Sequence, residues 1–269
     1  MPIVYACIAP HGGNLLLGLD APGPVPSCRR AMAQMRESLR HSRAESVAIL
    51  TPHGVYQPGV MTLGVTPMGY GELDTLQVSV QTDLDLAAAW AYKAVQKNIP
   101  VVPLTGQSED DRLPLDWGVT IPLALLTPPP DTLPTVVACP ARDLTRQNLM
   151  DWGEALAEAS DETGKRVALI VSADQGHGHA ADGPYGYTAV SAEYDAAMAA
   201  AIETNDLRRL LDWPEDYAER ALADSYWQTL SLLGIQKRLP LRAKLLSYEV
   251  DHYFGLLCAE FLPECGDQK

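Results

Sequence analysis

The stretch VALIVSADQGHGH, residues 167–179, guides the interpretation of the whole chain. It opens with five apolar residues, from Val167 to Val171, as is typical of a strand buried on both faces of a sheet. The run then changes to polar residues and glycines, and it ends with His177 and His179. Because open α/β sheets bind ligands at the carboxyl ends of their strands, this pattern predicts a functional site at a strand end.

Two other apolar runs end in the same way. Residues 4–11, VYACIAPH, end in His11 and precede two glycines, and residues 47–53, VAILTPH, end in His53 and precede one glycine. A glycine beside a site lets the backbone approach a ligand closely, because it has no side chain to obstruct the contact. The sequence therefore predicts three strand ends that present histidines to one cleft.

The rest of the chain alternates helix and strand patterns. Amphipathic or alanine-rich stretches predict helices that start near residue 26 and that cover residues 83–97, 145–160, 191–203 and 214–234. Apolar and β-branched runs predict strands at 101–104, 135–139 and 243–250, a strand pair at 59–66 and 76–82, and a last apolar segment at 254–261. This order predicts a single α/β domain over residues 1–269, with a central mixed β-sheet and helices on both faces.

Composition limits the partners that we expect. The chain has 269 residues, 47% of them hydrophobic, which is enough to bury a large core. Its formal net charge of −14 and its pI near 4.7 argue against nucleic acid and anionic membranes as partners. No apolar run approaches the ~20 residues of a membrane helix. The five cysteines form no CxxC pair, so we expect a cytoplasmic protein with reduced thiols.

The histidines at the strand ends favour metal chemistry. Neutral imidazole suits divalent first-row metals, and two histidines with one carboxylate leave coordination positions open for other ligands. The sequence lacks G-x-S-x-G, H-E-x-x-H and G-x-x-x-x-G-K-[ST]. A hydrolase with a Cys–His pair stays open as an alternative. We interpret Asp174 as a turn former in the glycine-rich segment.

In the order and spacing of its motifs, the chain resembles the class III extradiol ring-cleaving dioxygenases, the superfamily of the protocatechuate 4,5-dioxygenase catalytic subunit. No single motif is specific, and the resemblance rests on their succession along most of the chain. The matching elements are IAPHGG with His11, LTPHG with His53, Asp116-Trp117-Gly118 with Pro122-Leu123, SADQGH with His177, Tyr185-Gly186-Tyr187, Glu193-Tyr194-Asp195, Leu232-Leu233-Gly234 and Ser247-Tyr248-Glu249.

The resemblance implies a ligand set and a proton carrier. His11 and His53 match the two histidine ligands of a non-haem ferrous ion, and His177 matches the acid/base histidine. The third ligand of the family is a glutamate, and the aligned position here is an alanine, Ala223. We expect the adjacent Asp224 to be the third ligand, with Glu249 as the reserve candidate.

The resemblance also implies a reaction, in which dioxygen is inserted into a catechol-type aromatic ring adjacent to the diol. We expect His179, Trp117 and Tyr185 to bind the substrate, and Arg142 or Arg242 could bind a substrate carboxylate. The expected partners are the small aromatic diol and dioxygen. A homo-oligomer, in particular a dimer, and a small accessory subunit are further expectations.

Two alternatives stay open within the same resemblance. Memo-type proteins keep the fold and a histidine-lined cleft, but act in signalling or redox roles without dioxygenase activity. Ring-opening enzymes of the plant DOPA-dioxygenase type use zinc in place of iron. The resemblance therefore covers two metals, Fe(II) and Zn, and both catalytic and non-catalytic proteins.

Overall fold

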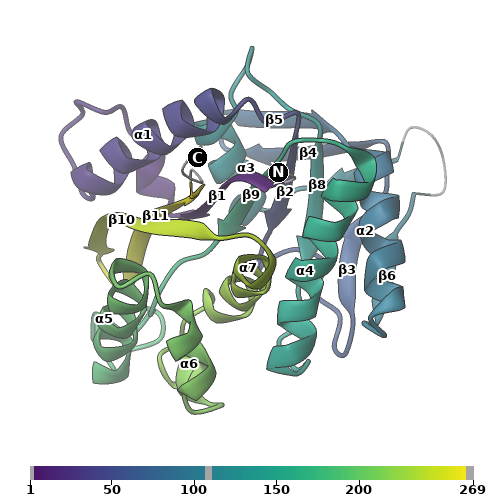
Figure 1. The fold of residues 1–269 in the computed structure, drawn as a ribbon. Coiled ribbons are helices and arrows are strands. Elements are labelled where there is room, and N and C mark those ends of the chain that lie inside the picture. The colour runs from purple at the N-terminus through teal and green to yellow at the C-terminus, as the bar shows by residue number, and fades with distance from the viewer. Residues whose placement is uncertain (1–2, 107–110, 265–269) are drawn as a thin grey trace, which may run out of the picture.

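The computed structural model describes residues 3–106 and 111–264. Its main sheet is mixed and has the strand order β10-β11-β1-β9-β2-β8-β3-β6 (Figure 1). Strands β1, β9, β2 and β8 run parallel to one another, while β11 is antiparallel to β1 and β3 is antiparallel to β8. In that order the strands are β10 (Leu241–Asp251), β11 (Phe254–Pro263), β1 (Ile3–Ala9), β9 (Val167–Ser172), β2 (Ser46–Leu50), β8 (Thr135–Cys139), β3 (Met61–Gly64) and β6 (Val101–Leu104).

Helices cover both faces of this sheet, which confirms the predicted fold class. Adjacent residues of the central strands point into two different cores, Cys7 into one and Ile8 into the other, so the strands are apolar at almost every position. Helices α1 (Pro26–Ser42) and α3 (Trp117–Leu126) complete the first core. Helices α2 (Leu84–Gln96), α4 (Arg146–Thr163), α5 (Ala189–Glu203) and α7 (Tyr226–Arg238) complete the second. None of the described helices is both long and apolar enough to cross a membrane.

The glycine of the Leu232-Leu233-Gly234 motif has a packing role. Helices α4 and α7 cross at this point, and a Cβ atom on Gly234 would lie 1.9 Å from the carbonyl oxygen of Met150. Only glycine therefore permits this close crossing. The crossing packs α7 closely against α4, and α7 follows directly on the segment that carries Asp224.

The predicted strand pair at residues 59–66 and 76–82 is wrong. Strand β3 lies in the main sheet, between β6 and β8. The partner of β5 (Leu76–Gln81) is β4 (Met68–Leu73), and together with β7 (Arg112–Pro114) they form a separate three-stranded sheet. The sheet is mixed because of β3 and β11, and not because of the predicted pair.

The helical region predicted at residues 214–234 is present, but it is interrupted. A short helix α6 (Tyr217–Arg220) ends before Leu222, which has a left-handed backbone with φ 54°, and α7 begins at Tyr226. Two 3₁₀ helices, η1 (Gly13–Leu16) and η2 (Leu207–Asp212), complete the described elements. The interruption is the segment that delivers Asp224 to the site.

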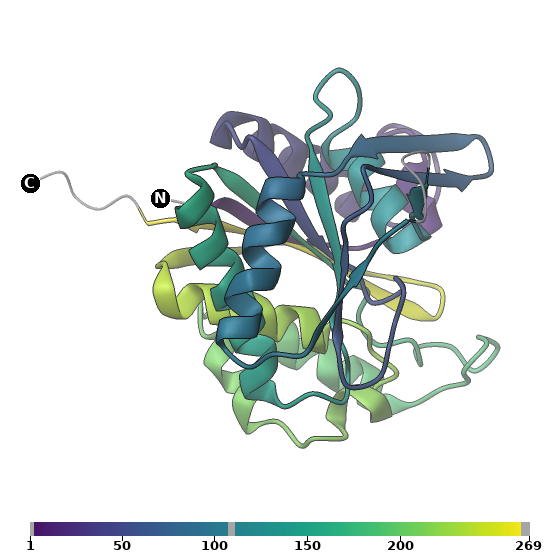
Figure 2. The ribbon, with the colours of Figure 1, turned by 90° about the vertical axis from the view of Figure 1, so that its right-hand side faces the viewer.

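Three segments project from one side of the molecule. In Figure 2 the β4–β5 hairpin (blue), the β10–β11 hairpin (yellow) and the loop before α5 (green) extend toward the same side. Each of them contributes a side chain to one cavity: Leu73, Tyr253 with Phe254, and Tyr185. This cavity opens beside the strand ends from which the histidines come.

Candidate metal centre and active site

The strand register brings the three predicted histidine segments together. Strand β9 lies between β1 and β2, with Ala9 opposite Ser172 and Leu50 opposite Val171. The carboxyl ends of the three parallel strands therefore lie at one edge of the sheet. Helix α1 covers one face and α4 the other, which makes this edge the kind of crevice in which α/β proteins bind ligands.

Asp224 reaches this edge from the break between α6 and α7. Its Oδ1 accepts a hydrogen bond from the backbone N–H of Asp174 at 2.9 Å. Two backbone carbonyls of the same segment accept hydrogen bonds from His177. The backbone N–H of His177 donates to the carbonyl of Ala221 at 3.3 Å, and its Nδ1 lies 2.8 Å from the carbonyl of Leu222. The segment after β9 and the segment before α7 thus hold each other in place.

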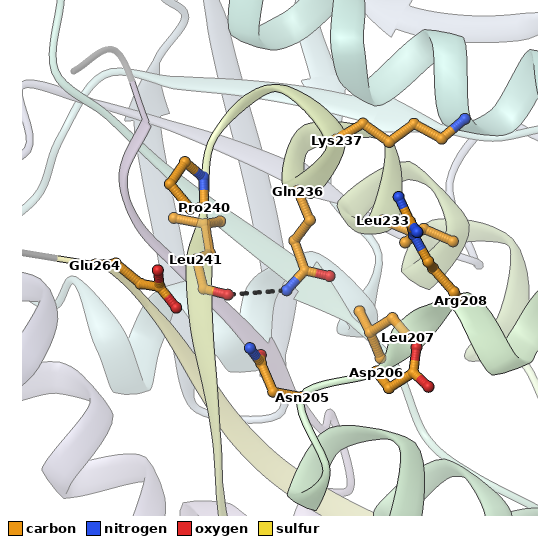
Figure 3. Close-up of a pocket in the computed structure, with 10 residues that line it drawn as sticks. All are labelled: Asn205, Asp206, Leu207, Arg208, Leu233, Gln236, Lys237, Pro240, Leu241 and Glu264. Atoms are coloured by element: carbon orange, nitrogen blue, oxygen red, sulfur yellow. Dashed lines mark hydrogen bonds between the residues drawn. The ribbon is translucent and has the colours of Figure 1, made fainter. Parts of the chain in front are cut away.

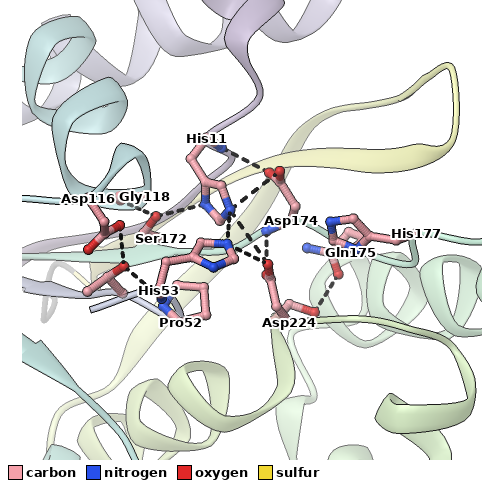
Figure 4. Close-up of polar contacts among 12 residues, drawn as sticks. His11, Pro52, His53, Asp116, Gly118, Ser172, Asp174, Gln175, His177 and Asp224 are labelled. Carbon is pink, nitrogen blue, oxygen red and sulfur yellow. Dashed lines mark hydrogen bonds and ion pairs between the residues drawn. The ribbon is translucent and has the colours of Figure 1, made fainter. Parts of the chain in front are cut away.

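His11, His53 and Asp224 converge on one point (Figure 4). The Nε2 atoms of the two histidines are 3.0 Å apart, and Asp224 Oδ2 lies 3.5 Å from His11 Nε2 and 3.2 Å from His53 Nε2. Donors bound to one first-row ion at about 2.0–2.2 Å, with angles of roughly 90–109°, lie about 2.8–3.6 Å from one another. The donor separations therefore fit a single divalent ion.

Two further observations support this fit. Asp224 Oδ2 is buried and meets only the two Nε2 atoms, at 3.2 and 3.5 Å and without hydrogen-bond geometry, so the three atoms face one another as the ligands of one ion would. Ser172 Oγ donates its one hydrogen to the carbonyl of Gly118, so it accepts from His11 Nδ1 at 2.9 Å. Neutral His11 then carries its proton on Nδ1, and the lone pair on Nε2 is available to a metal.

The Asp116-Trp117-Gly118 element supports both histidines. Asp116 Oδ1 accepts a hydrogen bond from Thr51 Oγ1 at 3.0 Å, and Thr51 Oγ1 accepts one from the backbone N–H of His53 at 3.2 Å. The ring of Trp117 packs against that of His53 with centroids 4.3 Å apart. This element therefore orients His53, and through Gly118 and Ser172 it also orients His11.

Negative charge dominates the electrostatics of the site. Burial alone would lower the pKa of His11, but the carboxylates of Asp174 and Asp224 raise it to about 9. Burial alone would raise the pKa of Asp224, but the imidazoles of His11 and His53 hold it below its ordinary range. Burial raises the pKa of Asp174, against the effect of His11 and reinforced by the charge of Asp224. A divalent cation would neutralise this excess of carboxylates.

His177 has the tautomer that a proton acceptor requires. A carbonyl oxygen can only accept, so the contact with Leu222 places the ring proton on Nδ1 and leaves Nε2 as the basic nitrogen. The ring stacks on Phe254 at 5.6 Å with an interplanar angle of 12° and meets the edge of Tyr185 at 6.0 Å. It is thus held at the cavity wall and does not belong to the group of three converging donors.

The cavity has a volume of about 300 Å³. Trp117 and Tyr185, both predicted to bind substrate, line it, and they are 49% and 62% exposed. The complete lining is His11, Gly12, Gly13, His53, Leu73, Trp117, Ile121, Asp174, His177, Tyr185, Tyr253 and Phe254.

Two predicted residues lie elsewhere. His179 is not among the described lining residues, and its Nε2 is 2.8 Å from Asp195 Oδ2. Glu249, the reserve ligand, accepts a hydrogen bond from the backbone N–H of Cys28 in the first turn of α1 and lies outside the group of three donors. The structure thus gathers His11, His53 and Asp224 but does not bring Glu249 or His179 to them.

Sequence reasoning missed several residues of the site. The local sequence indicates only a turn former at Asp174, yet this residue is buried, lines the cavity and accepts a hydrogen bond from the backbone N–H of His11 at 2.9 Å. A carboxylate directly after a buried strand is the signal that could have identified it. Leu73, Tyr253 and Phe254 come from hairpin tips, and no local pattern places a hairpin tip over a distant strand end.

A second cavity, of about 190 Å³, lies where η2, the end of α7 and the start of β10 meet (Figure 3). Its charged lining residues carry both signs, Arg208 and Lys237 with Asp206 and Glu264. Among its described residues there is no histidine and no buried polar atom without a partner. It therefore offers none of the features that mark the strand-end cavity.

An open mixed α/β sheet with two histidines at the carboxyl ends of its strands, joined there by an aspartate from the segment before α7, defines a protein with a candidate mononuclear metal centre. Residues 5–252 match the family described as the catalytic LigB subunit of aromatic ring-opening dioxygenase, and the chain belongs to this family. The resemblance inferred from the motifs is thereby confirmed. None of the curated proteins matches the chain.

One solved structure extends the comparison to the fold. The chain is similar to the crystal structure of an uncharacterized protein from Escherichia coli K12, with 15% sequence identity and a TM-score of 0.65. The similarity covers 96% of this chain and 99% of that one. At this level of identity it supports the shared fold and carries nothing about activity.

Proposed function

We propose that the protein is a non-haem Fe(II)-dependent extradiol dioxygenase that inserts dioxygen into a catechol-type ring adjacent to the diol. Membership of the ring-opening dioxygenase family supports the reaction class. The observation that carries the proposal is the convergence of His11, His53 and Asp224, with one carboxylate oxygen unpartnered, next to a separate basic histidine. Two histidines and one carboxylate on one side of an ion suit non-haem Fe(II) and leave positions for two reactants.

His11, His53 and Asp224 would hold the ion, which when bound supplies Lewis acidity and a common binding point for catechol and dioxygen. His177 accepts the hydroxyl proton of the catechol at Nε2 and later returns it, while its Nδ1–H keeps donating a hydrogen bond to the carbonyl of Leu222. The apolar side chains of Leu73, Ile121 and Phe254 keep water from the reacting ring.

The experiment compares three forms of the protein, prepared without oxygen: metal-free, loaded with Fe(II) and loaded with Zn(II). Each form is given a panel of catechols, and catechol binding, oxygen uptake and the yellow colour of ring-fission products are measured. The proposal requires that the Fe(II) form takes up one dioxygen per catechol cleaved and that the metal-free form takes up none.

Two results would contradict the proposal. Ring fission by the Zn(II) form alone would replace iron by zinc. Tight catechol or metal binding with no oxygen uptake in any form would favour a metal- or ligand-binding protein of the Memo type.

A further inference from the structure

We infer that the catechol this site takes carries no acidic substituent on its ring, so that substrates of the dihydroxybenzoate kind are rejected in favour of uncharged or cationic ones. This inference rests on the proposed function, because it names the substrate class of the same cavity. It concerns the walls of the cavity, which the metal ligands and His177 do not determine.

The described part of the cavity wall contains no cation to receive a carboxylate. Among its lining residues none is lysine or arginine, and the only charged type besides histidine is an acid, Asp174. Carboxylates are normally bound by arginine or lysine, arginine often with two parallel hydrogen bonds, and this wall offers neither.

The two arginines that could bind a substrate carboxylate, Arg142 and Arg242, lie outside the cavity. Arg142 donates to the carbonyl of Pro52 at 3.1 Å, and its guanidinium lies 4.8 Å from the ring centre of Trp227. Arg242 lies at the start of β10, paired in register with Leu262, whereas the cavity is at the other end of that hairpin, where Phe254 lies. Neither side chain lines the cavity.

The surroundings would disfavour an added negative charge. Asp174 lines the cavity, and no lysine or arginine among the described lining residues offsets its charge. A carboxylate taken from water into such a place loses its hydration without gaining a cationic partner, and it meets the carboxyl group of Asp174. A cation fares differently, because the faces of Trp117, Tyr185 and Tyr253 attract positive charge.

The test uses three ligands of nearly one shape: 3,4-dihydroxybenzoate, 3,4-dihydroxybenzamide and 3,4-dihydroxybenzylamine. Their dissociation constants are measured without oxygen on the metal-loaded protein, and oxygen uptake is then measured with each. We expect the benzamide and the benzylamine to bind roughly 10- to 100-fold more tightly than the benzoate, the range expected when a charged group is left unpaired.

The outcomes separate this inference from the proposed function. Benzoate binding that equals or exceeds benzamide binding would overturn the inference, whether or not the ring is cleaved. A benzylamine that binds as weakly as the benzoate would show that the cavity rejects charge of either sign, and would overturn the argument from the acidic wall. Graded binding without ring cleavage by any form would contradict the proposed function and leave the inference about the wall standing.

Variants that add a cation give an independent check. Leu73 is half-buried at the tip of the β4–β5 hairpin, so Leu73→Lys should tighten benzoate binding relative to benzamide, while Leu73→Met, of similar length and uncharged, should leave the ratio unchanged. Tyr185→Arg is the second variant, because Tyr185 is 62% exposed and the change should not disturb the fold. If a folded Lys or Arg variant leaves the ratio as it was, the inference is wrong.

Discussion

The segment that follows β9 contacts two histidine–carboxylate clusters: its Asp174 N–H donates to Asp224 in one, and its Gly176 N–H donates to Asp195 in the other. We call His11, His53 and Asp224 the open cluster, and His179, Asp195 and Tyr248 the closed cluster. In the closed cluster Asp195 Oδ1 accepts a hydrogen bond from Gly176, and Oδ2 accepts bonds from His179 and Tyr248 at 2.8 and 2.7 Å. In the open cluster one oxygen of Asp224 accepts nothing from the described residues.

The space around the two carboxylates differs as well. A Cβ atom on Gly255 would lie 2.1 Å from Asp195 Oδ2, so the backbone of β11 closes over that carboxylate and leaves no room for an ion. The open cluster borders the cavity of about 300 Å³ through His11 and His53. The comparison teaches that residue types alone do not identify a ligand site. A ligand site is identified by a buried polar atom that lacks a hydrogen bond and lies next to a cavity.

The largest expected effect is the loss of metal when the open cluster loses its carboxylate. Asp224→Ala should bind no Fe(II) at concentrations that saturate the unchanged protein, because partners outside the ligand set already cost about 10- to 100-fold and a ligand should cost more. Metal content is measured by elemental analysis and affinity by chelator competition, and circular dichroism checks that the fold survives.

Glu249→Ala is the matched control for this prediction. It removes a carboxylate that binds the first turn of α1 and lies outside the group of three donors, so metal binding should be retained. Full iron occupancy in Asp224→Ala would remove Asp224 from the ligand set and would undermine the distinction between the clusters.

The second prediction concerns the two histidines on either side of Gly178. His177→Phe should keep its iron and still bind catechol, while kcat falls by about 10²–10⁴-fold, the usual range for general acid–base catalysis. His179→Phe should leave kcat per bound iron nearly unchanged, because its ring bonds Asp195 and does not line the cavity.

Oxygen consumption per bound iron decides between these two histidines. Partial recovery of turnover in His177→Ala on adding imidazole would show that the missing group carries protons. Loss of iron from His177→Phe, or slower turnover in His179→Phe than in His177→Phe, would mean that the assignment of roles is wrong.

The comparison also shows what the sequence could predict. The central strands were predictable because burial on both faces requires an apolar residue at nearly every position, and residues 167–171 satisfy this. The partner of a strand was harder to predict. Strand β4 has the sequence MGYGEL, whose two glycines weaken the strand signal, and they occur there because Leu115 and Thr120 pack against them. Residues 76–81 were therefore assigned to the wrong partner.

The residues of the site also fall into those that the strand pattern predicts and those that it does not. His11, His53 and His177 follow buried strands directly, so their meeting at one edge followed from the sheet alone. Asp224 was selected from a resemblance, although the alignment fell on Ala223, and only the left-handed turn at Leu222 explains how it reaches the cluster. That turn depends on contacts from His177, which no local sequence pattern contains.

The third prediction is the opposite of the first: stability should change, while metal binding should not. Asp195→Ala should lower the free energy of unfolding by about 3–5 kcal/mol, because it leaves His179, Tyr248 and the N–H of Gly176 without their buried acceptor. Metal stoichiometry of the folded protein should stay unchanged. Urea titration with elemental analysis tests both statements.

Asp182→Ala is the control for the closed cluster. It removes an exposed aspartate that also pairs with a histidine, His252 at 3.1 Å, and it should leave the free energy of unfolding unaltered. If Asp195→Ala is as stable as the unchanged protein, or if it loses its metal, the closed cluster is not the structural counterpart described here.

The smallest expected effect is that of Ser172, which contacts His11 of the open cluster. Ser172 Oγ accepts from His11 Nδ1 and donates to the carbonyl of Gly118, and so it fixes which nitrogen of His11 faces the other donors. Ser172→Ala removes this orientation but no ligand, so metal affinity should fall by about 10- to 100-fold, as is usual for partners of a ligating histidine. Chelator competition measures the change, and Ser172→Thr, which keeps the hydroxyl, should restore most of it if its added methyl group is accommodated. An affinity that is unchanged in Ser172→Ala would show that the backbone alone orients His11, and the difference between the clusters would then rest on Asp224 and the cavity.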